Sequence, residues 1–137
     1  MLQFVIAYVC AGLWMLVVDA VWLTSMISVY RQHLGELLHD GVRLGPAIAF
    51  YLLYVFGITW FAILPALEND GNWQQAALNG ALLGLVAYGT YDLTNQATMK
   101  TWPTFITLMD MAWGAILTGT AAVAGTLAAR AFAPGGS

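Results

Sequence analysis

Four long apolar runs divide the chain, and each is long enough to cross a lipid bilayer as a helix. They cover residues 2–23, 45–67, 73–95 and 104–129. A spanning helix needs about 20 mostly apolar residues, because the hydrocarbon core is about 30 Å thick and each residue advances a helix by about 1.5 Å. The pattern therefore predicts an all-α fold, a four-helix transmembrane bundle that forms a single domain over residues 1–131.

The first polar connection, "SVYRQHLGELLHDG" (28–41), has a pattern of its own. Its residues on one helical face are Tyr30, Leu34, Leu37 and Leu38. This pattern predicts a short amphipathic interfacial helix between the first two spans, with a plain extension of the first span as the alternative. At the other end of the chain, residues 132–137 are expected to form a flexible tail.

The second connection, "ENDGNW", has strong turn chemistry. The Asp70-Gly71 pair predicts a tight turn, and Asn72 with Gln75 resembles a capping box at the start of the third helix. In the last connection, Pro103 is expected near the start of the fourth helix.

The composition narrows the class of protein. The chain is 61% hydrophobic and only 8% charged, whereas soluble domains carry roughly 25% charged residues. An integral membrane protein is therefore expected, with the lipid bilayer as its surroundings. The chain has no basic patch, which argues against nucleic acid as a partner. Cys10 is the single cysteine, so an internal disulfide and a CxxC redox site are excluded. The first run lacks the features of a cleaved signal peptide.

The basic residues suggest an orientation. Arg31, Arg43 and Lys100 lie in the first and third connections, and Arg130 lies on the opposite side. Because short cytoplasmic loops are enriched in Lys and Arg, these two connections are expected in the cytoplasm and both termini outside.

Three of the seven acids fall inside the spans. Asp19 and Asp92 lie about five residues before the ends of their helices, and Asp110 lies about six residues into its own. At 1.5 Å per residue, all three sit roughly 8–9 Å below the same surface. This layer follows from the helix count alone and does not depend on the orientation.

The helical faces agree with this layer. Stripes at i, i+3 and i+4 are expected to face inward: Tyr8, Gly12, Met15, Asp19 and Trp22; Phe50, Tyr54, Gly57 and Phe61; Gly80, Gly84, Tyr88, Tyr91, Asp92 and Asn95; and Asp110, Trp113, Gly114, Leu117, Ala121 and Ala124. Their small residues allow close helix packing. The bundle is expected to open toward the cytoplasm into a pocket. The predicted ligand-binding residues are Asp19, Trp22, Tyr88, Tyr91, Asp92, Asn95, Asp110 and Trp113.

The chemistry of the acids leaves alternatives open. If the three meet, they cannot all ionise freely, so the site is expected to hold a proton or a cation. The alternative is a purely structural role, in which the three acids join helices through hydrogen bonds or form ion pairs with Arg31, Arg43 or Lys100. An all-oxygen Mg²⁺ site is chemically reasonable, but nothing in the sequence specifies it. His33 and His39 are six residues apart, which does not fit an i, i+4 metal pair. No metal or cofactor is therefore assigned.

Two spans carry the same short motif. Asp19 and Trp22 in "VDAVWL", and Asp110 and Trp113 in "MDMAWG", both form D-x-x-W. A tryptophan one turn from an aspartate can shield a carboxylate or stack on a cation. Both motifs lie on the same side of the membrane, so they are not evidence of an inverted repeat.

Several segments together resemble a known family. They are "AYGTYDLTNQAT", "VVDAVWL", "YRQHLG", "FYLLYVFG" and "MDMAWGAILT". These resemble the bacterial integral membrane family catalogued as domain of unknown function 2177, over nearly the whole chain. The resemblance implies a small four-helix protein of the bacterial inner membrane. It implies no reaction, and the eight predicted ligand-binding residues match its motif positions.

Four functions fit these observations. The first is a protein that binds a small amphiphile, a lipid headgroup or a cation in the acidic and aromatic pocket. The second is a membrane enzyme that acts on a lipid, with Asp19, Asp92 and Asp110 as catalytic candidates. The third is a proton-coupled small transporter working as a homodimer, although its acids would lie near one surface rather than at the midplane. The fourth is an accessory subunit of a larger membrane complex.

Overall fold

The computed structural model describes residues 1–34 and 44–132, and all regular structure in that part of the chain is helical. The helices are α1 (Leu2–Leu34), α2 (Leu44–Ile58), α3 (Leu64–Glu68), α4 (Trp73–Thr98) and α5 (Thr104–Phe132). A π-helical segment, η2 (Thr59–Ile63), joins α2 to α3 without a break. The chain therefore forms four helical rods, which confirms the predicted all-α membrane bundle.

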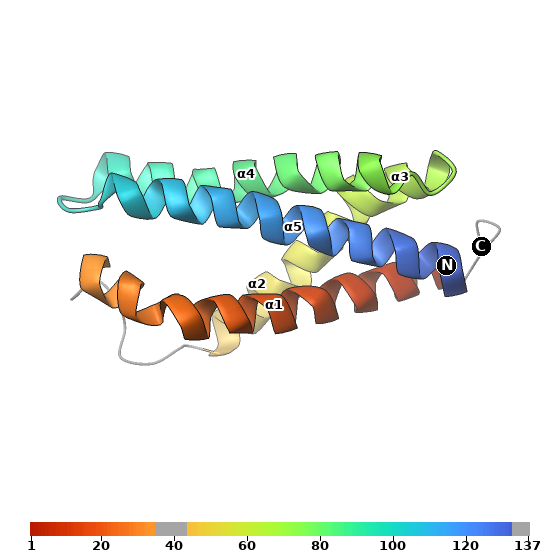
Figure 1. Cartoon of the computed structure of the whole chain (residues 1–137), viewed down its shortest axis with the longest axis horizontal. Helices are drawn as coiled ribbons and strands as arrows, with labels where there is room; N and C mark the ends of the chain where they lie inside the picture. The colour runs from red at the N-terminus through yellow and green to blue at the C-terminus, as the bar shows by residue number, and fades with distance from the viewer. Residues whose placement is uncertain (35–43, 133–137) are drawn as a thin grey trace.

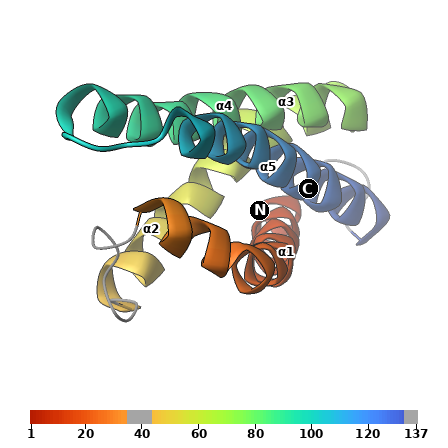
Figure 2. The ribbon, with the colours of Figure 1, turned by 60° about the vertical axis from the view of Figure 1, so that its left-hand side comes forward.

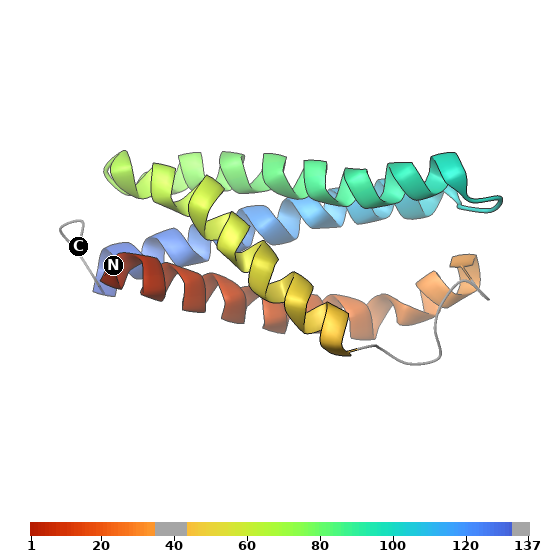
Figure 3. The ribbon, with the colours of Figure 1, turned by 180° about the vertical axis from the view of Figure 1, so that it is seen from behind.

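Three rods are roughly aligned and the fourth crosses them. Figure 1 shows α4 and α5 side by side, with α1 along the other side of α5. The α2–α3 rod crosses them obliquely, from beside α1 to beside α4 (Figure 2), and is seen in front in Figure 3. The start of α1 and the end of α5 lie at one end of the bundle, and the end of α1 and the end of α4 lie at the other (Figure 1).

Membrane-spanning character is clear for three of the rods. The helices over Leu2–Leu34, Leu44–Glu68 and Thr104–Phe132 are long and apolar enough to cross a bilayer. Large apolar side chains such as Leu53 and Leu82 are exposed on the outside of the bundle, as expected where lipid replaces water. The rod α4 is also of spanning length but more polar, so its crossing of the membrane stays a prediction.

Glycines bring α4 and α5 together. A Cβ atom added to Gly84 would lie 2.1 Å from the carbonyl oxygen of Gly114, and one added to Gly80 would lie 2.7 Å from that of Thr118. No side chain fits at these distances, so the two backbones are in direct contact. Gly80, Gly84, Gly114 and Leu117 are buried, as the predicted inner stripes of these helices require.

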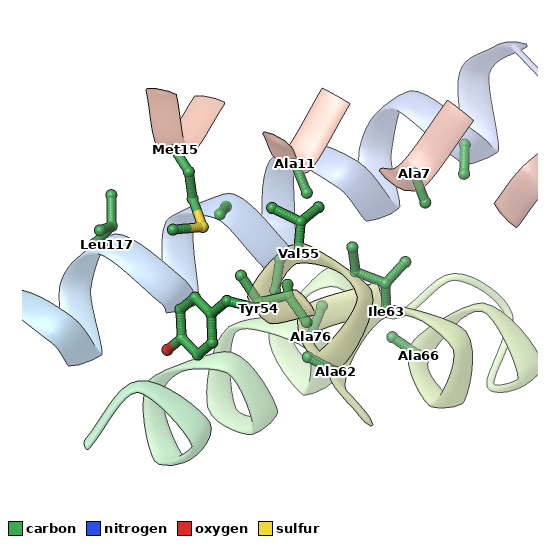
Figure 4. Close-up of a cluster of buried hydrophobic side chains, with 14 residues drawn as sticks. Ala7, Ala11, Met15, Tyr54, Val55, Ala62, Ile63, Ala66, Ala76 and Leu117 are labelled. Atoms are coloured by element: carbon green, nitrogen blue, oxygen red, sulfur yellow. The ribbon is translucent and has the colours of Figure 1, made fainter. Parts of the chain in front are cut away.

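The core lies where α1 meets the crossing rod. Figure 4 shows Ala7, Ala11 and Met15 of α1 facing Val55 and Ile63. All five side chains are at most 3% exposed. Because the alanines are small, the crossing rod approaches α1 closely at this end of the bundle.

The stripe predicted for the second span is wrong in part. Tyr54 is buried, but Phe61 is 63% exposed, and Ala62 and Ile63 are buried instead. The π-helical segment explains the difference, because each π turn holds an extra residue and rotates the following side chains around the axis. Pro65 follows directly; it has no N–H to donate, and its ring crowds the carbonyl four residues earlier.

The connections correct two further predictions. The first connection begins as an extension of α1 as far as Leu34, not as a separate interfacial helix; Leu37 and Leu38 lie outside the described residues. Asn72 caps α4 by accepting hydrogen bonds from the backbone N–H groups of Gln74 and Gln75 at 3.0 and 3.2 Å. The Gln75 side chain instead accepts from Asn69, so the capping box is only half formed. Asp70 and Gly71 form the predicted turn with positive φ.

Candidate functional site

A cavity of about 520 Å³ lies between α1, α2, α4 and α5, on the side of the core away from the termini. Its lining residues are Asp19, Trp22, Leu23, Ile27, Tyr30, Leu34, Phe50, Ala87, Tyr88, Tyr91, Asp92, Trp102, Asp110 and Trp113. They include seven of the eight residues singled out from the sequence. The exception is Asn95, which is half-buried on α4 and lies outside this lining.

Asp19 joins three helices. One of its carboxylate oxygens accepts a hydrogen bond from the Tyr51 hydroxyl of α2 at 2.8 Å, and the other accepts from the indole Nε1 of Trp113 in α5 at 3.2 Å. Both oxygens therefore have a donor. This arrangement holds the α1 carboxylate in place and satisfies both of its oxygens.

Asp110 is held from the extended end of α1. The Tyr30 hydroxyl donates a hydrogen bond to Oδ1 of Asp110 and accepts one from Nε1 of Trp22 at 3.1 Å. The sequence reading missed both Tyr30 and Tyr51. One signal could have found them: a tyrosine buried in an apolar helix needs a partner for its hydroxyl. Tyr30 also follows Trp22 by eight residues, which places the two on one helical face.

The two D-x-x-W motifs form one crossed clamp. Trp22 and Trp113 stack with ring centroids 4.2 Å apart and planes within 7° of parallel. Each indole serves the aspartate of the other helix. Trp113 donates to Asp19 directly, and Trp22 acts on Asp110 through the Tyr30 hydroxyl. The motifs are thus paired in space although they do not form a repeat.

The stacked tryptophans also line a second hollow. It is a groove of about 410 Å³, lined by the same two indoles and by Val17, Val18, Val21, Ser25 and Met26. Val17 and Val21 are exposed on the outside of α1. The tryptophan pair therefore borders both the cavity and this groove.

Asp92 differs from the other two aspartates. It is only 1% exposed and lines the cavity together with Asp110. Its Oδ1 atom is buried and has no hydrogen-bond partner within the described part of the chain. Such unsatisfied buried oxygens are costly and rare.

The three acids line one cavity but are not placed to share a metal ion. Among the described residues, no group of three His, Cys, Asp or Glu side chains is placed to hold a metal ion. The Mg²⁺ alternative therefore has no support. Arg31 and Lys100 do not support the alternative of ion pairs with the aspartates, because neither residue lines the cavity. Arg43 lies outside the described residues.

The histidines lie apart from this chemistry. His33 stacks on Phe105 with centroids 4.9 Å apart, and its Nδ1 lies 2.9 Å from the carbonyl oxygen of Val29. The stacking joins the end of α1 to the start of α5, whereas the contact with Val29 lies within α1. His39 lies outside the described residues.

Comparison with known proteins gives one match. A family model described as "Predicted membrane protein (DUF2177)" matches residues 4–127. This match confirms the resemblance that the motifs indicated. Comparison with curated proteins and with solved structures finds no match.

Proposed function

The chain belongs to the DUF2177 family of predicted membrane proteins, and from this premise we propose that it is a membrane-embedded binding protein for a small amphiphile. The observation that carries the proposal is Asp92, a buried carboxyl group that lines the cavity and whose Oδ1 atom has no hydrogen-bond partner among the described residues. Cavities of about 300–1,000 Å³ are typical of small-molecule sites. A polar group bound at Asp92 would supply a hydrogen-bond donor to this carboxyl group.

The lining suits an amphiphile rather than a fully polar ligand. Apolar side chains, among them Leu23, Ile27 and Phe50, make up most of it, and the polar groups are few. A bilayer also supplies amphiphiles at high local concentration. In this proposal the aspartates anchor the headgroup, and the aromatic and aliphatic walls hold the tail.

Native mass spectrometry of protein released from membranes in a mild detergent would test the proposal. Wild type should carry a discrete bound mass that is lost in Asp92→Asn. Asp70→Asn is the matched control, because Asp70 is an exposed residue in the turn at the opposite end of the bundle. Equal spectra for all three proteins, with no adduct in any of them, would refute a binding function for the cavity.

A second candidate rests on the presence of Asp92 and Asp110 in one cavity lining. Two neighbouring carboxyl groups can supply one general acid and one general base to a reaction. A membrane enzyme that acts on a lipid would use these two groups. Incubation with a total lipid extract, followed by mass spectrometry of the lipids, would show turnover by wild type and none by Asp110→Asn.

We propose that the cavity faces the cytoplasm in the inner membrane of a bacterium. Arg31 and Lys100 lie at the cavity end of the bundle, whereas Arg130 lies near the termini. Positive charge is enriched on the cytoplasmic side.

A further inference from the structure

Resting on the proposed binding function, we infer that the headgroup in the cavity is an ammonium ion that carries N–H bonds, a primary or secondary amine. The structure points away from phosphate, carboxylate and quaternary ammonium headgroups. Three independent features of the lining lead to this class.

The first feature is charge. Three carboxyl groups line the cavity, and no Lys, Arg or His is among its described lining residues. An anionic headgroup would enter without a counter-charge and close to other carboxyl groups, at a high cost in a medium of low dielectric. A cationic headgroup would instead be attracted by these carboxyl groups.

The second feature is the distribution of hydrogen-bond donors. Asp19 has a donor on each oxygen, and Asp110 has one from Tyr30. Asp92 differs, because its Oδ1 atom is buried and has no donor in residues 1–34 and 44–132, the part of the chain that the structure describes. A quaternary ammonium has no N–H to offer it, whereas a protonated primary amine has three.

The third feature is the aromatic wall. Trp22, Tyr88 and Trp113 line the same cavity as Asp92. Cations are attracted to the faces of tryptophan and tyrosine rings. An ammonium ion can therefore hydrogen-bond to the Asp92 carboxyl group while its aliphatic chain lies along Ile27, Phe50 and the rings.

Three probes with the same eight-carbon tail separate the headgroup classes: octylamine, octyltrimethylammonium and octyl phosphate. The full-length protein would be placed in phosphatidylcholine nanodiscs at neutral pH, where the primary amine is protonated. Intrinsic tryptophan fluorescence reports binding, because three of the six tryptophans, Trp22, Trp102 and Trp113, line the cavity. Empty nanodiscs correct for partition into lipid. Octylamine should bind at least about 10-fold more tightly than octyltrimethylammonium, because a hydrogen bond to a charged group contributes about that factor. Octyl phosphate should show no saturable binding.

Variants test whether the preference for octylamine depends on Asp92. Asp92→Asn should lower octylamine affinity by about 10-fold and remove most of the preference over octyltrimethylammonium, while Asp70→Asn should retain both. Equal affinity of the two cations for wild type, or tighter binding of octyl phosphate, would overturn the inference even if Asp92→Asn fails to fold. Absence of saturable binding by all three probes would instead overturn the proposed binding function itself.

Discussion

At the scale of single residues, Asp92 carries the most information. A carboxyl oxygen buried without a donor lowers stability, so its presence in a helix needs a compensating role. The neighbouring aspartates show that the fold can satisfy such groups, since Asp19 and Asp110 both accept hydrogen bonds from tyrosines. Asp92 lines the same cavity, which is the arrangement expected of a carboxyl group that binds a ligand.

We expect Asp92→Asn to leave the ligand-free fold intact. The amide has the same shape and reduces repulsion with Asp110, so the free energy of unfolding should stay unchanged or rise by up to about 1 kcal/mol. Unfolding in SDS followed by circular dichroism measures this. A loss of more than about 2 kcal/mol would show that the carboxyl group is needed for stability.

The crossed clamp predicts a contrast between two tryptophans. Trp113→Phe keeps an aromatic ring against Trp22 but removes a donor from Asp19, so it should cost about 1–3 kcal/mol of stability. Trp14→Phe also removes an indole hydrogen bond, to Thr120, but at an exposed position. It should cost less than about 1 kcal/mol. Equal losses in the two variants would contradict the role given to the Trp113 indole.

At the scale of helices, the contact between α4 and α5 rests on glycine. A methyl group at Gly84 would overlap the backbone of Gly114, so Gly84→Ala should push the helices apart and cost about 3 kcal/mol or more. At Gly57 nothing lies within 4 Å of an added Cβ. Gly57→Ala should therefore be neutral or add up to about 1 kcal/mol through helix propensity. Thermal unfolding of both variants in detergent is the measurement, and a stable Gly84→Ala would contradict the close contact.

The crossing rod shows how one backbone irregularity changes an element. Tyr54 lies on the buried face, but within η2 the buried face is shifted, so Phe61 faces outward. Because the α2–α3 rod runs obliquely to the other helices, the start of α2 lies away from α4 and α5 (Figure 3). The cavity occupies the end of the bundle where this rod does not fill the space between α1 and α4.

At the scale of the whole molecule, cysteine labelling tests both the orientation and the crossing of α4. In a Cys10→Ser background, Thr101→Cys and Asp70→Cys place single thiols at exposed positions at the two ends of α4. In intact cells, an impermeant maleimide should label Asp70→Cys and not Thr101→Cys. The reverse result would invert the orientation. Labelling of both would show that α4 does not cross the membrane.

The helical rods were predictable from sequence, and so was the common depth of the three aspartates along them. Apolar runs of sufficient length, separated by turn residues, leave few alternatives in a bilayer, because every backbone polar group must be satisfied within a helix. The spacing of Asp19, Asp92 and Asp110 along their helices then gave their common depth. This reasoning needs only the rise per residue and the alternating direction of the rods.

Tertiary structure alone decided how these residues are partnered. The stacking of Trp22 on Trp113, the donation by Tyr30 and Tyr51, and the isolation of the Asp92 oxygen depend on helix rotation and crossing angle. A small rotation moves a side chain from one neighbour to another without changing its depth. The chain by itself therefore determined which polar groups share a layer, and packing determined which of them is left free, because hydrogen bonds depend on ångström distances that helical periodicity does not specify.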